Sequence, residues 1–113
     1  MMLRLLSSPL TMLKLDFPQK YSAELIRILD LYAPKQEIWA YGSRIKGNNH
    51  EASDLDLVIK NPLKPLEKFK ELDQLRIALS ESNIPIIIDV MDWARIPEHF
   101  REEILKEHLV LKT

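Results

Sequence analysis

The residues best suited to chemistry lie in the stretch YGSRIKGNNHEASDLDLVI, which spans residues 41–59. It contains both glycines of the chain, Gly42 and Gly47, and two aspartates, Asp54 and Asp56, in an otherwise apolar segment. Residues two apart on a strand point to the same face, so these carboxylates would lie about 6.5 Å apart. Such a pair repels unless a cation or solvent lies between them. The spacing predicts a cation site; in the alternative, Asp54 caps the strand and Asp56 faces solvent.

A third carboxylate interrupts the apolar segment IPIIIDVMDW, residues 84–93, which predicts a buried strand beside the first pair. Burying a lone carboxylate such as Asp89 is unfavourable unless it finds a partner. A cluster with Asp54 and Asp56 would provide one, and carboxylate oxygens without nearby His or Cys suit Mg²⁺. Asp92 is the alternative third ligand, although on a continuous strand it points to the opposite face. In the simplest alternative, Asp89 pairs with a Lys or Arg.

The glycines predict a phosphate-binding turn ahead of the aspartates. A strand that ends at Gly42-Ser43 and leads into a short helix presents free backbone N–H groups and a hydroxyl, which suit phosphate oxygens. Gly42 lets the backbone approach closely because it has no Cβ. Arg44 and Lys46 add positive charge nearby. Taken alone, these residues also fit an ordinary β-turn with solvated cations.

Apolar periodicity predicts the elements that position these residues. Three helices are expected: residues 18–33, residues 65–81, and a last one from Pro97 with Phe100, Ile104 and Leu109 on its buried face. Strands are expected over residues 37–43, 54–60 and 84–93, with a short one in the tail at 109–112. The order predicts an α/β (α+β) fold, a small mixed sheet with helices packed against it. Residues 1–17 are expected to be a loosely ordered leader, and residues 18–113 the single domain.

Composition limits the classes of function. A chain of 113 residues suffices for one core, and its net charge of −1 disfavours non-specific binding to nucleic acid or membrane. The absence of cysteine excludes disulfides and thiolate metal sites and fits a cytoplasmic location. The leucine-rich start is interrupted by Arg4, Pro9 and Lys14 and is too short to span a bilayer.

The motifs combine into one pattern, G-S-x10-D-x-D…D, carried by Gly42-Ser43, Asp54, Asp56 and Asp89. With it the sequence resembles the polymerase-β-like nucleotidyltransferase superfamily, most of all its MNT-type minimal members. The resemblance extends from about Met12 to the end of the chain and includes IWAYGSRIKG, SDLDLVI and IDVMDW. It implies the palm fold of that superfamily.

The resemblance also implies a role for each motif residue. The Gly-Ser turn of these enzymes holds the β and γ phosphates of a nucleoside triphosphate, here through Gly42 and Ser43, with Arg44 neutralising charge nearby. Their three carboxylates bind two Mg²⁺ ions, and the third can also take the proton of the attacking hydroxyl. The corresponding residues here are Asp54, Asp56 and Asp89. Two such ions suit an in-line displacement that needs mainly positioning and charge neutralisation.

The acceptor of the nucleotide is expected to come from another chain. Larger members bind it with a second, helical domain, for which the residues after Asp89 are too few. Minimal members are typically paired with an all-helical HEPN protein, and several act as antitoxins that transfer AMP from ATP to a tyrosine of the HEPN ribonuclease. We therefore expect Mg²⁺-dependent AMP transfer to such a partner in a homo- or hetero-oligomer, without membrane or direct nucleic-acid binding.

Two alternatives remain open at this point. The chain could be a binding module that neutralises a helical partner by contact, through exposed members of the set Trp39, Tyr41, Met91 and Trp93. Core packing is the simpler interpretation of each of these side chains. The chain could also transfer a nucleotide to a small molecule such as an aminoglycoside, as two-domain relatives do.

Overall fold

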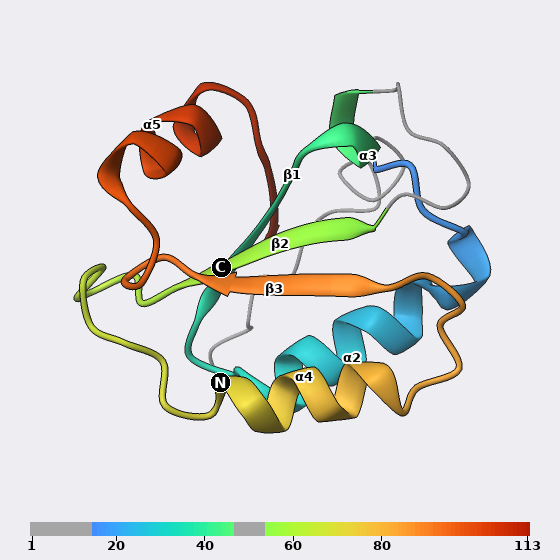
Figure 1. Cartoon of the computed structure of the whole chain (residues 1–113). Helices are drawn as coiled ribbons and strands as arrows, with labels where there is room; N and C mark the ends of the chain where they lie inside the picture. Colours follow the sequence, from blue (N-terminus) through green and yellow to red (C-terminus); the bar gives the residue numbers. More distant parts are fainter. Residues whose placement is uncertain (1–14, 47–53) are drawn as a thin grey trace.

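A mixed sheet of four strands forms the centre of the protein, in a computed structural model that describes residues 15–46 and 54–113 (Figure 1). The elements in chain order are η1 (Gln19–Tyr21), α2 (Ser22–Tyr32), β1 (Glu37–Tyr41), α3 (Ser43–Lys46), β2 (Leu55–Lys60), α4 (Leu72–Ser80), β3 (Ile88–Asp92), α5 (Glu98–Lys106) and β4 (Leu109–Lys112). The predicted strand at the tail and the predicted short helix after Gly42-Ser43 are confirmed.

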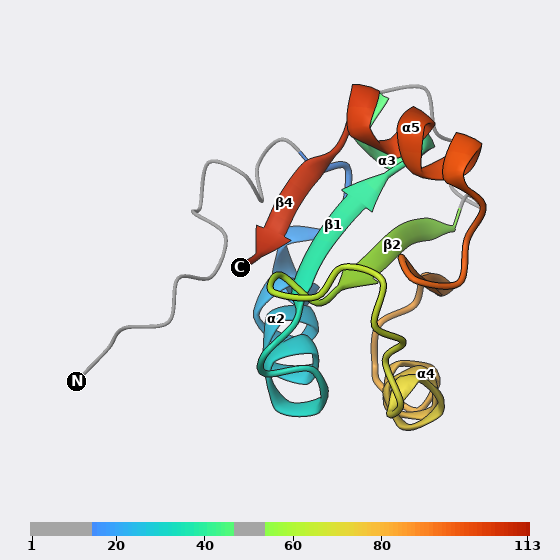
Figure 2. The same ribbon diagram turned by 90° about the vertical axis from the view of Figure 1, so that its left-hand side faces the viewer.

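The strands follow the spatial order β3-β2-β1-β4. Strand β1 pairs antiparallel with both β2 and β4, whereas β2 and β3 are parallel and are joined by a crossover that contains α4. The predicted α+β fold with a small mixed sheet is therefore confirmed. Helices α2 and α4 cover one face of the sheet, and α5 lies over the other (Figures 1 and 2).

The alternation of β2 assigns its side chains to these two faces. Leu55, Leu57 and Ile59 are buried in the larger core, against α2 and α4. Val58 belongs to a smaller cluster on the α5 side, together with Trp39, Trp93, Ile96 and Ile104. Asp56 shares the face of Val58, as the period of two predicts. The carboxylates therefore lie on the side of the sheet that α5 covers only in part.

The end of α2 is fastened to β4 by a buried lysine. Lys112 is fully buried, and its Nζ donates hydrogen bonds to the carbonyl oxygens of Ala33 (2.7 Å), Pro34 (3.1 Å) and Gln36 (2.8 Å). The last carbonyls of a helix lack amide partners, and a cation is favourable beside them. Lys112 thereby joins the turn between α2 and β1 to the far edge of the sheet.

Helix α4 is shorter than the prediction of residues 65–81. The backbone N–H of Phe69 donates to Asp92 Oδ2 (2.8 Å) instead of to a carbonyl one turn earlier. Asn61 Oδ1 accepts from the N–H groups of Leu63 and Lys64 (3.0 Å each), which stabilises a turn. These bonds hold residues 61–71 outside the helix, so α4 begins at Leu72.

Three further predictions, about where β3 begins, where the last helix ends and where the leader ends, are wrong. Strand β3 begins at Ile88, and Ile87 is 71 % exposed, so the apolar run is not covered throughout. Leu109 belongs to β4 and not to the buried face of the last helix. Leu15 and Phe17 are buried in the larger core, so packed structure reaches into the predicted leader; residues 1–14 lie outside the described part.

Candidate active site

Three side chains form a row across the sheet on the α5 side. Asp56 of β2 is the direct neighbour of Tyr41 on β1 and of Asp89 on β3. Asp54 lies two residues before Asp56, just ahead of β2, and is exposed. Asp89 is exposed as well, not buried as the sequence suggested, because it lies on the side of the sheet that α5 covers only in part, whereas Val90 on the other side is buried. The predicted proximity of Asp89 to Asp56 is confirmed by the register of the parallel pair.

The charges of these carboxylates act on one another. The pKa of Asp56 is raised, first by burial and then by the negative charges of Asp89 and Asp54. Within residues 15–46 and 54–113, however, no three His, Cys, Asp or Glu side chains converge closely enough to hold one metal ion. The two observations agree, because Coulomb repulsion acts well beyond coordination distance.

Gly42 brings the end of β1 against Asp56. Its φ is +86°, a backbone conformation that residues with a Cβ rarely adopt. A Cβ at this position would lie 2.5 Å from Asp56 Oδ2. Both the conformation and the space require glycine, and the predicted approach of this backbone to a phosphate stays a prediction.

The residues after Gly42 form the short helix α3, which begins at Ser43. Arg44 is buried, and its Nη1 donates to the carbonyl oxygen of Asp16 (2.8 Å) while Asp16 N–H donates to the Arg44 carbonyl (2.8 Å). Arg44 thus fastens the segment before η1, and contact of Ser43 or Arg44 with phosphate stays a prediction. Lys46 forms an exposed ion pair with Glu107, with 3.9 Å between Nζ and Oε1.

Tyr41 is a site residue that the sequence did not single out for the site. Its half-buried ring packs edge-on against Phe100 of α5, with centroids 5.7 Å apart. Burial, followed by the charges of Asp56 and Asp89, raises the pKa of its hydroxyl far above the ordinary value. Tyr41 therefore presents a protonated hydroxyl beside the carboxylates. Its position directly before Gly42, at the end of the strand, was the available signal.

Asp92 has a structural role apart from the row. It is buried; Oδ2 accepts hydrogen bonds from the N–H of Phe69 (2.8 Å) and from Arg95 Nε (3.1 Å), and Oδ1 accepts from the N–H of Ala94 (3.1 Å). These partners use both oxygens of the carboxylate. Asp89, and not Asp92, is therefore the third carboxylate beside Asp56.

The tryptophans considered for a contact surface belong to the core. Trp39 and Trp93 are each 6 % exposed and meet edge-to-face, with centroids 5.3 Å apart. Lys60 Nζ lies 4.5 Å from the ring centroid of Trp39 and 4.7 Å from that of Trp93. Core packing is thereby confirmed for both tryptophans.

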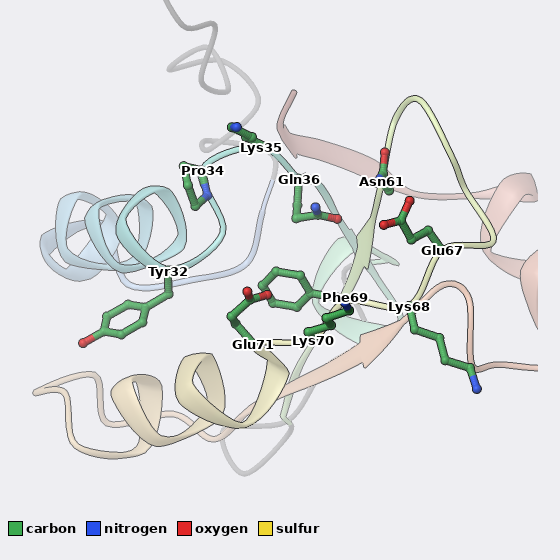
Figure 3. A pocket seen from close by; sticks show the side chains of 10 residues that line it. All are labelled: Tyr32, Pro34, Lys35, Gln36, Asn61, Glu67, Lys68, Phe69, Lys70 and Glu71. Atoms are coloured by element: carbon green, nitrogen blue, oxygen red, sulfur yellow. The ribbon is translucent and has the colours of Figure 1, made fainter.

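A separate hollow of about 470 Å³ lies between the end of α2 and the loop before α4 (Figure 3). Gln36 and Asn61 are among its lining residues, next to the start of β1 and the end of β2. The carboxylate row lies at the other ends of those strands. None of the predicted site residues lines this hollow.

Comparison with known proteins identifies the chain. Residues 23–113 match the family described as "Polymerase beta, Nucleotidyltransferase". The protein belongs to this family. The nucleotidyltransferase is also 40 % identical to a probable protein adenylyltransferase MntA of Haemophilus influenzae over 99 residues. This aligned region covers 88 % of this chain and 85 % of that relative.

Solved structures share the fold of this nucleotidyltransferase. Two chains match with TM-scores of 0.64 over 80 % of this chain and 71 % of each, at 19 % and 17 % identity. One comes from a toxin–antitoxin crystal structure with AMP-PNP, and the other from a mutant MntA-HpeT toxin–antitoxin. Across residues 15–46 and 54–113, no helix of the nucleotidyltransferase combines the length and apolar character needed to cross a membrane.

Proposed function

We propose that this nucleotidyltransferase transfers AMP from ATP to a tyrosine hydroxyl of an all-helical HEPN partner, and so acts as the antitoxin of a toxin–antitoxin pair. The observation that carries the proposal is the placement of Gly42 against Asp56, which brings the predicted phosphate-binding turn to the predicted metal-binding carboxylates. The 40 % identity to a probable protein adenylyltransferase supports AMP as the group transferred and a protein as its acceptor.

The donor set fits Mg²⁺ in its chemistry. Asp54, Asp56 and Asp89 offer hard carboxylate oxygens, and ionising all three without a cation is unfavourable, as the raised pKa of Asp56 indicates. Binding an ion in common would require the exposed side chains of Asp54 and Asp89 to turn toward Asp56. Bound there, Mg²⁺ would neutralise the charge of the reacting phosphates.

The residues of the chain have distinct tasks in this reaction. Ser43 and the backbone at Gly42 hold the β and γ phosphates, while Arg44 keeps the start of α3 in place through Asp16. The acceptor oxygen attacks the α phosphorus, the bond from that phosphorus to the bridging oxygen breaks, and pyrophosphate leaves. The proton of the acceptor hydroxyl passes to the carboxylate of Asp89, which is exposed and therefore accessible to a second protein.

The test is to incubate the protein with the helical protein encoded beside its gene, ATP and Mg²⁺, and to measure the intact mass of that neighbour. We expect a gain of one or more AMP masses. Transfer should be abolished by EDTA and by Asp56→Asn, whereas Glu81→Gln at the exposed end of α4 should leave it unchanged. Absence of a mass gain at saturating ATP would overturn the proposal.

An assay of the neighbour's toxicity distinguishes this proposal from the alternative of a binding module that neutralises by contact. If the Asp54→Asn/Asp56→Asn double variant still neutralises the neighbour at equal concentration, neutralisation operates by contact and not by transfer. If the unsubstituted protein neutralises the neighbour and the double variant does not, the enzymatic proposal stands.

A further inference from the structure

A second charged hollow lies at the outer edge of the sheet. A cavity of about 350 Å³ opens between the start of α4, strand β3 and the turn that follows β3. Three cations contribute to its lining, namely Lys70, Arg76 and Arg95. None of them takes part in the reaction proposed above.

Both guanidinium groups are held on one side only. Arg76 donates from Nε (3.2 Å) and Nη2 (2.6 Å) to the carbonyl oxygen of Val90, and Arg95 donates from Nε to Asp92 Oδ2 (3.1 Å). Within residues 15–46 and 54–113, Nη1 of Arg76 and both Nη groups of Arg95 have no partner. A guanidinium anchored in this way presents a fixed set of donors that suits a carboxylate or phosphate.

The acidic residues of the cavity cancel only part of this charge. Asp92 is buried and forms an ion pair with Arg95, with 3.1 Å between Oδ2 and Nε, while Asp73 lies exposed in the first turn of α4. Three cations and two carboxylates therefore leave the lining with an excess of one positive charge. The remaining wall is apolar and consists of Phe69, Leu72, Met91 and Ile96. The cavity thus combines anion donors with space for an apolar group.

The cavity borders the carboxylate face. Met91 lies two residues after Asp89 on β3 and points to the same side of the sheet, and Asp89 and Asp92 are about 10 Å apart along the strand. β3 is an edge strand, and Arg76 covers its Val90 carbonyl, which hinders the addition of another strand at that point. A protein that approaches Asp89 along this edge would be engaged through side chains.

We propose that this cavity is an oxyanion subsite that binds an Asp or Glu side chain of the acceptor protein, with a neighbouring apolar residue against Met91 and Ile96. The proposal rests on the proposed function in taking the acceptor to be a protein. Its role is docking, so it should affect the concentration at which the acceptor saturates the enzyme and leave the rate at saturation unchanged.

The test measures binding of the helical neighbour to the Asp54→Asn/Asp56→Asn double variant, because AMP transfer does not then occur during the measurement. Lys70→Gln and Arg95→Gln should each weaken binding about tenfold, and the loss should shrink at high salt. Arg27→Gln, which removes an exposed cation on α2, is the matched control. In the active protein, the two cavity variants should raise KM for the acceptor without lowering kcat.

Lys70→Gln decides the outcome if Arg95→Gln fails to fold, because Lys70 is exposed and forms no hydrogen bond or ion pair within the described residues. The proposal would be overturned if Lys70→Gln bound the neighbour as tightly as the protein with an unsubstituted cavity, or if Arg27→Gln weakened binding equally. It would also be overturned if the protein with an unsubstituted cavity did not bind the neighbour. Competition by millimolar inorganic phosphate alone would reassign the cavity to a phosphate ligand. Transfer that is insensitive to all cavity variants would overturn this inference and leave the proposed function standing.

Discussion

A Cβ on Gly42 would lie 2.5 Å from Oδ2 of Asp56, so the turn at the end of β1 and the carboxylate of β2 are in direct contact. The two parts of the predicted site, which are separated by residues 44–53 in the sequence, therefore meet in space. Their contact depends on the absence of a side chain at one position.

Gly42→Ala should impair both folding and nucleotide binding. The new Cβ would meet Asp56 and would force an unfavourable φ, which together cost about 1–3 kcal/mol of the free energy of unfolding. Denaturant unfolding and ATP titration measure the two effects. Ser43→Ala keeps the backbone and is the comparison; it should lose nucleotide affinity with little loss of stability. Equal stability of the Gly42→Ala and unsubstituted proteins would contradict the steric interpretation.

Asp56→Asn should stabilise the metal-free protein at neutral pH. Because the folded-state pKa of Asp56 is raised, its protonated form favours folding at low pH, and this contribution is lost as pH rises through the folded pKa. The ionised group therefore opposes folding at pH 7. The gain from Asn should be below about 1 kcal/mol after solvent screening and should disappear below pH 3.8. Thermal unfolding with EDTA between pH 3 and 8 measures it.

The effect of Mg²⁺ on thermal stability tests whether a cation binds at the carboxylate row. Added Mg²⁺ should raise the Tm of the unsubstituted protein and should have a smaller effect on Asp56→Asn, because binding to the folded state alone stabilises it. Asp73→Asn should respond to Mg²⁺ like the unsubstituted protein. An equal response of all three proteins would exclude a cation at the carboxylate row.

Asp89→Asn and Asp92→Asn should impair different properties of the protein. Asp89 is exposed, so its substitution should change stability by less than about 0.5 kcal/mol but reduce AMP transfer at least about 100-fold. Asp92 is buried and holds Phe69, Ala94 and Arg95, so Asp92→Asn should cost about 2 kcal/mol of stability. Urea unfolding and the mass assay, run on both variants, separate the two roles.

Lys112→Met should strongly destabilise the protein. The substitution keeps the apolar stem but leaves the carbonyl groups of Ala33, Pro34 and Gln36 without their buried donor, at a cost of about 3 kcal/mol. Lys64→Met, at an exposed position, is the control and should be nearly neutral. A loss below about 1 kcal/mol would show that water replaces the ammonium group.

The sequence could predict those features that depend on local patterns. The period of two in β2 placed Asp56 opposite Leu55 and Leu57, and the Gly-Ser pair marked the end of β1. The neighbouring positions of Asp56 and Asp89 were predicted from the cost of burying a lone carboxylate; the positions are confirmed, but Asp89 is exposed, so that cost is not what places it there.

Features set by contacts between distant residues could not be predicted in this way. The start of α4 depends on a hydrogen bond between Phe69 and Asp92, and the exposure of Asp89 depends on how much of its side of the sheet α5 covers. The burial of Lys112 depends on carbonyl groups that lie 76 to 79 positions earlier in the chain. Periodicity carries no signal for any of these.

The parallel register of β2 and β3 ties correct folding to correct assembly of the carboxylate row. A slip of β3 by one residue would turn Asp89 toward α2 and α4 and would expose Val90 on the opposite side. Such a molecule would bury an unpaired charge and lose apolar packing at once. Packing of the hydrophobic core therefore disfavours a misaligned β3, so a molecule in which Asp56 and Asp89 are not side by side would be less stable than the correctly folded protein.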